Sequence, residues 1–209
     1  MFTQTVNSST LAILKKFMDV EILKTTRLVG GTALALQLGH RFSIDIDLFG
    51  NLSDFDNLDL ENQLKAIGKL EITTLNSANA INSGYVDNVK FDIVNYNYSW
   101  IESEIIEDGI RMAGLKDIAA MKVAAIGSRG AKKDFYDLYF LLEKFTIYEI
   151  ISFFSQKYSI YNDFHYVQSL CYFEDAEKTE QPITFKPLSW KKVKARIVKE
   201  IQGLDFTKL

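Results

Sequence analysis

Two aspartates, Asp45 and Asp47, lie one residue apart inside the apolar run "FSIDIDLF". Apolar and polar residues alternate here, which predicts a strand with Ser43 and both carboxylates on one face and Ile44 and Ile46 on the other. Like charges held together in apolar surroundings are costly without a cation. Mg²⁺ takes one or two carboxylates plus phosphate oxygens and water, so the pair predicts a Mg²⁺ or Mn²⁺ site that acts on a phosphate. A half-exposed strand with a polar outer face is the alternative that Asp-X-Asp alone leaves open.

Two glycines, Gly30 and Gly31, lie between the short apolar run "RLV" and the small-residue run "TALALQL". Glycines between a strand and a helix let backbone N–H groups approach an anion at the positive end of the helix. The spacing fits neither a P-loop, which needs Gly-Lys-Ser/Thr, nor a dinucleotide-binding turn, which needs a third glycine. The glycines therefore predict a phosphate held beside the metal, and a tight turn with close packing is the alternative.

A third carboxylate, Asp92, lies in the alternating run "VKFDIVNY", with Lys90 and Val94 on its own face. Three carboxylates are what a two-metal site uses when two cations, about 3.5–4 Å apart, stabilise the attacking and leaving oxygens of an in-line phosphoryl displacement. Close before the first aspartate pair, Arg41 is expected to hold a phosphate or an ion pair, and Ser43 to hydrogen-bond a phosphate or a metal-bound water.

Charged residues of the second half of the chain have their own possible roles. Lys122 lies in the apolar run "LKDIAAMKVAAIG", where a lysine would neutralise phosphate oxygens as pyrophosphate leaves, unless it is an exposed lysine of an amphipathic helix. Asp134 and Asp137 lie near the start of the next predicted helix, where carboxylates favour the helix dipole and can pair with Arg129 or Lys133. For Asp134 a nucleotide-orienting role and a capping role both stay open, whereas for Asp137 we expect a structural role.

Hydrophobic periodicity indicates the elements that must position these residues. It predicts helices over residues 10–24, 32–39 and 56–68 and strands over residues 27–29, 42–49 and 69–76, followed by a strand pair within residues 78–97. From Leu115 onward the hydrophobic pattern is typical of helices, with two runs split near residues 127–130 and three further helical segments. The prediction is an α+β protein with a small mixed sheet over residues 1–112 and a mostly helical region over residues 113–209 that completes the active-site cleft.

Composition sets outer limits on the function. The 209 residues are 47% hydrophobic with a net charge of −3, which indicates a globular chain without a long-range field toward nucleic acid. The single cysteine excludes an intramolecular disulfide. The first residues lack the pattern of a secretion signal and no apolar run approaches the ~20 residues of a membrane span, so we expect a cytoplasmic protein without membrane contact.

The order of these motifs resembles a known group of enzymes. Gly-Gly, a small-residue helix, Asp-X-Asp and a later strand aspartate are the arrangement of the polymerase-β-like nucleotidyltransferases. The run "GGTALALQLGHRFSIDIDLF" is similar to the first two motifs of the AbiEii/AbiGii toxin family, bacterial nucleotidyltransferases that form the toxin half of abortive-infection toxin–antitoxin pairs. The run "KVAAIGSRGAKKDFYDLYFLL" resembles the later motifs of that family, so the likeness spans residues 28–142.

This resemblance implies a role for each matching residue. The expected nucleotide-binding residues are Gly30, Gly31, Thr32, Arg41, Ser43 and Lys122. The expected catalytic residues are Asp45, Asp47, Asp92, Lys122 and Asp134, and the first three of these are the expected metal ligands. Lys133 stands where the family usually has arginine, which keeps the charge and loses the planar bidentate fork.

The expected reaction moves a nucleoside monophosphate from ATP, GTP or CTP to an acceptor hydroxyl with Mg²⁺ or Mn²⁺, and pyrophosphate leaves. The resemblance implies as acceptor the 3′ end of tRNA, a protein or another target, and a separately encoded antitoxin that restrains growth arrest. Two alternatives stay open at this stage. One is a non-catalytic nucleotide- or partner-binding protein of the same fold, and the other is a metal-dependent phosphohydrolase.

Overall fold

The computed structural model describes residues 1–52, 56–76, 81–159 and 163–205. The chain forms two compact units: the first contains Met1–Gly39, Ser43–Asn97 and Glu104–Ala113, and the second contains His40–Phe42, Tyr98–Ser103 and Gly114–Leu209. The predicted boundary between residues 112 and 113 assigns segments 40–42 and 98–103 to the first part of the chain. In the structure both segments belong to the second unit, although first-unit residues flank them in the sequence.

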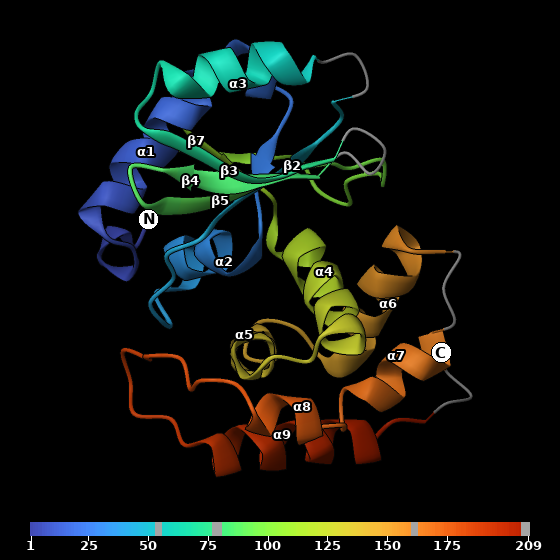
Figure 1. The fold of residues 1–209 in the computed structure, drawn as a ribbon. Coiled ribbons are helices and arrows are strands. Elements are labelled where there is room, and N and C mark those ends of the chain that lie inside the picture. The colour runs from blue at the N-terminus through green and yellow to red at the C-terminus, as the bar shows by residue number, and fades with distance from the viewer. Residues whose placement is uncertain (53–55, 77–80, 160–162, 206–209) are drawn as a thin grey trace. The chain divides into compact units, whose positions relative to one another are not determined.

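The first unit is built on a mixed sheet (Figure 1). Within the described residues its seven strands are ordered β3-β4-β5-β2-β1-β7-β6. They are β1 (Arg27–Leu28), β2 (Ile46–Gly50), β3 (Leu70–Asn76), β4 (Ile81–Val86), β5 (Val89–Asn95), β6 (Ile105–Glu107) and β7 (Ile110–Met112). Strand β2 runs parallel to β5 and antiparallel to β1. Helices α1 (Ser8–Asp19) and α3 (Asn57–Lys65) lie on one side of this sheet, and α2 (Gly30–Leu38) lies on the other.

Alternation along the central strands places buried apolar side chains on one face of the sheet and the carboxylates on the other. Phe91 and Ile93 of β5 are buried, and the ring of Phe91 meets Phe17 of α1 edge-on with centroids 5.6 Å apart. Ile46 and Leu48 of β2 are the register partners of Phe91 and Ile93, and both are fully buried. Because side chains alternate along a strand, Asp47 and Asp92 lie on the opposite face, toward α2. The predicted alternation is confirmed for these residues.

The strand that carries the aspartate pair is shorter than the predicted 42–49. It begins at Ile46, and Ile44 is 55% exposed instead of packing on the apolar side. The backbone N–H groups that precede the strand donate to residues outside the sheet. The N–H of Ser43 donates to the carbonyl oxygen of Thr5, and the N–H of Phe42 donates to the carbonyl oxygen of Ile183. These tertiary partners prevent the ladder from extending, so the expected placement of Ser43 and Asp45 on one strand face is wrong.

Two further differences concern helix α1 and a hairpin. The helix predicted over residues 10–24 ends at Asp19, because Val20 is extended and a short 3₁₀ turn, Glu21–Leu23, follows. Strands β6 and β7 were not expected. Asp108 and Gly109 between them both have positive φ, which is typical of the tight Asp-Gly hairpin turn, so this dipeptide was the available signal.

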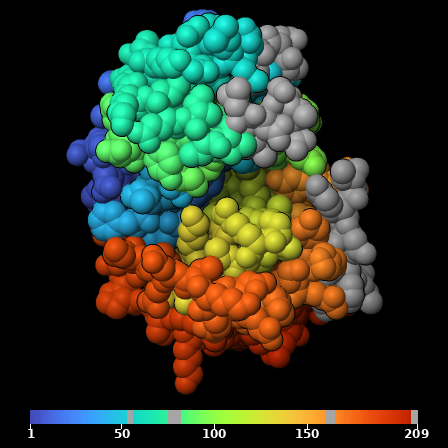
Figure 2. Space-filling view, viewed as in Figure 1, coloured from blue at the N-terminus to red at the C-terminus, as the bar shows by residue number. Residues whose placement is uncertain are grey.

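The second unit is helical, as predicted. Its helices are α4 (Leu115–Ser128), α5 (Lys132–Leu141), α6 (Ile147–Lys157), α7 (Asp163–Ser169), α8 (Glu174–Glu177) and α9 (Trp190–Gln202). The expected split near residues 127–130 is confirmed, because α4 ends at Ser128 and Gly130 takes a left-handed conformation. Figure 2 shows the orange and red residues of the later helices around the yellow residues of α4 and α5. Among the described residues, no helix is both long and apolar enough to cross a membrane.

A buried ion pair holds the 98–103 segment in the second unit. Asp117 of α4 and Lys157 of α6 are fully buried, with Lys157 Nζ 2.7 Å from Asp117 Oδ1. The backbone N–H groups of Ile101 and Glu102 donate to the Asp117 carboxylate at 2.9 and 3.0 Å. Lys157 also donates to the carbonyl oxygen of Ser99 at 2.9 Å. The segment is therefore fixed by a pair whose polar atoms are well satisfied.

Replacing Asp117 by asparagine should destabilise the second unit strongly. The change leaves the buried ammonium of Lys157 without its counter-charge, which costs about 3–5 kcal/mol. Denaturant unfolding followed by circular dichroism measures this loss. The matched control is Asp175→Asn, which breaks an exposed pair with Lys178 and should change the unfolding free energy negligibly. Equal losses in the two variants would contradict the structural role of Asp117.

Candidate active site

The first feature of the site is a pair of carboxylates on adjacent parallel strands. Asp47 of β2 and Asp92 of β5 are direct register partners. Neighbouring strands lie about 4.7–4.9 Å apart, so the two side chains leave the same face of the sheet next to each other. Asp45 lies just before β2, outside the ladder. The sheet thus brings together carboxylates that are far apart in the sequence.

Gly30 lets the Asp47 carboxylate approach the start of α2. Its φ is +68°, in the left-handed region that favours glycine. A Cβ atom on residue 30 would lie only 2.3 Å from Asp47 Oδ2, closer than any real side chain allows. The backbone N–H of Val29 donates to the carbonyl oxygen of Asp47 at 2.9 Å, which fixes the two segments side by side. The left-handed conformation therefore favours glycine at position 30, and any larger residue there must displace the Asp47 carboxylate.

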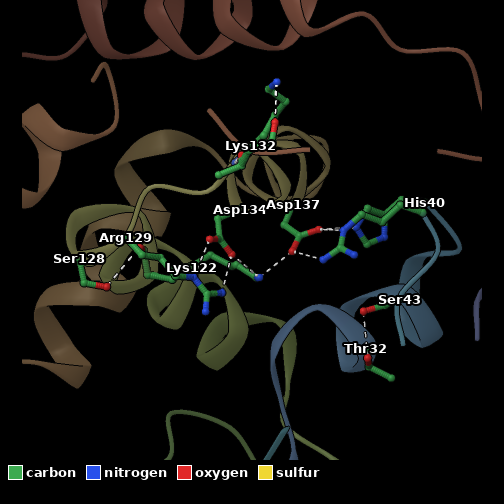
Figure 3. Close-up of polar contacts among 12 residues, drawn as sticks. Thr32, His40, Ser43, Lys122, Ser128, Arg129, Lys132, Asp134 and Asp137 are labelled. Atoms are coloured by element: carbon green, nitrogen blue, oxygen red, sulfur yellow. Dashed lines mark hydrogen bonds and ion pairs between the residues drawn. The ribbon is translucent and has the colours of Figure 1, made fainter. Parts of the chain in front are cut away.

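Thr32 ties the first turn of α2 to the residues before β2 (Figure 3). Its hydroxyl donates to the backbone carbonyl oxygen of Asp45 and lies 2.9 Å from the hydroxyl oxygen of Ser43. Thr32 is fully buried, so these contacts also satisfy a polar group that water cannot reach. The helix start, Ser43 and Asp45 thus form one hydrogen-bonded assembly within the first unit.

A lysine and a serine compensate the charge of the carboxylates. Lys90 Nζ lies 3.5 Å from Asp92 Oδ2, and the Ser83 hydroxyl donates to the other oxygen of Asp92. Partial burial opposes the charged form of Lys90, but the carboxylates around it outweigh burial and raise its pKa above the ordinary value. These carboxylates are Asp92, Asp45 and Asp47. Lys90 therefore acts as the common counter-ion of the three expected metal ligands.

The donor set of the first unit fits a hard divalent cation. Mg²⁺ needs only one or two protein carboxylates and takes its other ligands from phosphate oxygens and water. Asp47 and Asp92 supply two such groups side by side, and the ammonium of Lys90 already lies 3.5 Å from Asp92 Oδ2. Across the described residues, no three or more histidine, cysteine, aspartate or glutamate side chains are arranged as a closed metal cage. The geometry fits an ion held together with a phosphate ligand.

A second cluster of charges lies within the second unit, around Asp137 of α5 (Figure 3). Arg41 binds Asp137 through two bonds, Nε to Oδ1 at 2.6 Å and Nη2 to Oδ2 at 2.8 Å. Lys122 Nζ lies 2.6 Å from the Asp137 carboxylate, and His40 Nε2 lies 2.7 Å from it. Asp137 is fully buried. It was expected to pair with Arg129 or Lys133, and this part of the prediction is wrong, because tertiary partners replace the helical neighbours.

Asp134, one turn earlier on α5, continues the cluster. Lys122 Nζ lies 2.9 Å from Asp134 Oδ1, so one buried ammonium links the two carboxylates of α5. Arg129 adds two bonds to Asp134, from Nε at 3.0 Å and from Nη2 at 3.2 Å. The Arg129 side chain is 58% exposed, which makes it the accessible end of an otherwise buried network.

Burial and charge act in opposite directions on the pKa values of this cluster. Burial favours protonation of Asp137, but the cations Arg41 and Lys122 outweigh it and hold its pKa well below the ordinary value. Burial likewise opposes the charge of Lys122, yet the two carboxylates raise its pKa. For His40 burial is the largest influence and lowers the pKa. His40 is therefore neutral at pH 7 and donates its Nε2 proton to the ionised Asp137.

The expected site residues thus fall into two groups. The first unit holds Gly30, Gly31, Thr32, Ser43, Asp45, Asp47 and Asp92, and the second unit holds Arg41, Lys122 and Asp134. The ring of His40 also packs against that of Phe140, with ring centroids 5.0 Å apart. The sequence analysis did not predict the contacts that Lys90 and Ser83 make with Asp92. Lys90 stands two residues before Asp92 on the same strand face, which was the available signal.

Comparison with known proteins identifies the group to which these features belong. A family model described as "Nucleotidyl transferase AbiEii toxin, Type IV TA system" matches residues 12–208. An uncharacterised protein of Aquifex aeolicus (strain VF5) is 38% identical over 170 residues, covering 79% of this chain and 82% of that protein. The predicted family is therefore confirmed.

Solved structures share the fold at low sequence identity. MenT4, a nucleotidyltransferase toxin from Mycobacterium tuberculosis H37Rv, matches with a TM-score of 0.55 at 13% identity, covering 95% of this chain and 85% of that one. JHP933 from Helicobacter pylori matches with a TM-score of 0.54 at 16% identity, covering 94% and 92%. These likenesses confirm the predicted α+β nucleotidyltransferase fold.

A Gly30→Ala substitution should destabilise the first unit more than a comparable glycine substitution elsewhere. The left-handed backbone alone costs about 1–2 kcal/mol with a Cβ atom. At Gly30 the added methyl group must also displace Asp47, whereas a Cβ on Gly109, at φ +78°, meets nothing within 4 Å. The difference in unfolding free energy between Gly30→Ala and Gly109→Ala, from denaturant titrations, measures the contact with Asp47. Identical values would mean that the contact is absent.

His40 should make the stability of the protein pH-dependent. Its folded pKa lies below the ordinary 6.5, so the unfolded chain binds a proton at higher pH than the folded chain does. Its contribution to the free energy of unfolding is therefore complete above about pH 6.5 and declines as the pH falls toward the folded pKa. His40→Gln keeps a donor for Asp137 and should flatten this slope by up to about 1.4 kcal/mol per pH unit. Denaturant titrations from about pH 7.5 to about pH 5.5 test this, and an unchanged slope would refute it.

Proposed function

The chain belongs to the AbiEii family of nucleotidyltransferase toxins, and we propose that it transfers a nucleoside monophosphate from a nucleoside triphosphate to an acceptor hydroxyl. The observation that carries this proposal is the placement of Asp47 beside Asp92, with the Gly30 turn closed over Asp47. In the proposed reaction the acceptor hydroxyl gives up its proton, to a carboxylate of the site or to water, as its oxygen forms a bond to the α-phosphorus. The bond from that phosphorus to the β-bridging oxygen breaks, and pyrophosphate leaves with the electron pair.

The first unit would hold the reacting groups. Asp45, Asp47 and Asp92 are the proposed ligands of Mg²⁺ or Mn²⁺, which when bound supplies positive charge at the phosphates. Ser83 and Lys90 would position the Asp92 carboxylate, because each binds one of its two oxygens. The backbone N–H groups at Gly30 and Gly31 open α2, and the positive end of its dipole favours a bound phosphate.

The second unit would supply cations for the triphosphate. Lys122 and the more exposed Arg129 are the proposed contacts, and Asp134 orients both by binding them at 2.9 and 3.0 Å. Thr32, Ser43 and Arg41 complete the proposed nucleotide set, as residues that contact the nucleotide or orient the segment before Asp45.

The family also suggests the biological setting. A type IV toxin implies a separately encoded antitoxin, and we propose that this chain acts in the cytoplasm under such control. The first candidate for the acceptor is the 3′ end of a tRNA. A protein is the second candidate. The fold shared with MenT4, which is a nucleotidyltransferase toxin, supports this proposal.

Incubation with α-³²P-labelled ATP, GTP, CTP or UTP and either total RNA or total protein tests the reaction. We expect label in one acceptor fraction, dependent on Mg²⁺ or Mn²⁺. Asp47→Asn and Asp92→Asn should each lower incorporation by about a hundredfold or more, because each removes charge at the reacting centre. The matched control is Asp59→Asn on the exposed side of α3, which should label the acceptor as wild type does.

Other outcomes separate the alternatives. Release of free nucleotide without a labelled acceptor would indicate a phosphohydrolase, and no turnover with any nucleotide would indicate a binding protein. Expression in a host cell gives an independent readout, since growth arrest should occur with the wild-type chain and with Asp59→Asn but not with Asp47→Asn.

A further inference from the structure

Two stacked aromatic rings are exposed on the second unit. The rings of Phe42 and Phe185 have centroids 4.8 Å apart with planes inclined by 28°. They are 38% and 42% exposed, and Ile183, two residues before Phe185, is 70% exposed. Large apolar side chains gathered at the surface usually mark a binding site, whereas single ones need no explanation. We call Phe42, Ile183 and Phe185 the aromatic platform.

The backbone beneath the aromatic platform is firmly held. The N–H of Phe42 donates to the carbonyl oxygen of Ile183 at 2.9 Å, and that of Phe185 donates to His40 at 3.1 Å. Arg41 and Thr184 form an antiparallel bridge between these segments. Since the side chain of Arg41 is bound twice by the buried Asp137, the platform is anchored to the charge cluster of α5. A ligand that stacks here would therefore cost little ordering of the protein.

The covalent chain limits the distance between Phe42 and one of the proposed metal ligands. Phe42 precedes Asp45 by three residues, so their Cα atoms lie within about 11 Å of each other. That distance is on the scale of one or two nucleotides. The exposed Lys186 follows Phe185 directly and offers a charge for a phosphate of the same ligand.

We propose that the aromatic platform stacks a nucleobase near the 3′ end of a single-stranded RNA acceptor. This rests on the proposed transfer of a nucleotide to an acceptor hydroxyl. Aromatic side chains bind unpaired bases through their π-faces, and each stacked base contributes about 1–3 kcal/mol. A protein partner is disfavoured because a specific interface covers about 800 Å² on each side, far more than three side chains provide.

A short RNA with 2-aminopurine near its 3′ end reports directly on stacking, because the fluorescence of this base is quenched against aromatic rings. The Asp47→Asn variant serves as the background, so that binding is measured without transfer. We expect quenching on binding. Adding Phe42→Leu and Phe185→Leu should abolish the quenching and weaken RNA binding about tenfold while keeping apolar side chains in place. The control adds Tyr172→Leu, at an aromatic residue that is 52% exposed elsewhere, and should match the background.

A second arm identifies the bound base. An RNA with an abasic site at the reporter position should bind the background variant about tenfold more weakly and bind the double-leucine variant no differently from the intact RNA. Quenching that survives both leucine substitutions would overturn the proposal. So would a loss of nucleoside triphosphate binding with unchanged RNA binding, because the platform would then hold the donor base. Circular dichroism confirms that each variant is folded. Quenching without transfer activity in the wild-type chain would defeat only the proposed function.

Discussion

Like charges held on one sheet face are the constraint on which the first unit depends. The parallel pairing of β2 with β5 forces Asp47 and Asp92 into neighbouring positions, and their repulsion must be compensated. Lys90 provides a positive charge, Ser83 provides a hydrogen-bond donor, and Gly30 provides space for the carboxylate at the start of a helix. An arrangement that concentrates charge at this cost is typical of a site that binds a metal ion and phosphate, because their charges complement it.

In the second unit the same problem is solved in the opposite way. Asp137 and Asp134 are buried, and their negative charge is matched inside the protein by Arg41, Lys122 and Arg129. Such a network stabilises only when every member is satisfied, since a single unpaired buried charge costs several kcal/mol. Because Arg41 belongs to it, the network also fixes the short segment 40–42 that leads to Asp45. The motif residues of this unit therefore have a structural role, whatever contacts they make with a substrate.

Much of the fold could be predicted from local pattern. The Gly39 stop of α2, the break between α4 and α5 and the alternation of β5 follow from residues next to each other in the chain. The errors occur where distant residues compete for backbone hydrogen bonds. The strand of Asp47 is shortened because the backbone N–H groups of Ser43 and Phe42 donate to the carbonyl oxygens of Thr5 and Ile183. Neither acceptor can be predicted from the local sequence.

By itself, the sequence determined the kinds of chemistry present: carboxylates on an alternating strand, glycines at a helix start and a family motif order that names the reaction type. Side-chain type and spacing suffice for this because they set charge, size and backbone freedom. Only the tertiary structure decided which groups act together. Strand register placed Asp47 against Asp92 and Lys90, and the contact of segment 40–42 with α5 joined Asp137 to Arg41 rather than to its helical neighbours. Those pairings depend on contacts between residues tens of positions apart, which no local pattern encodes.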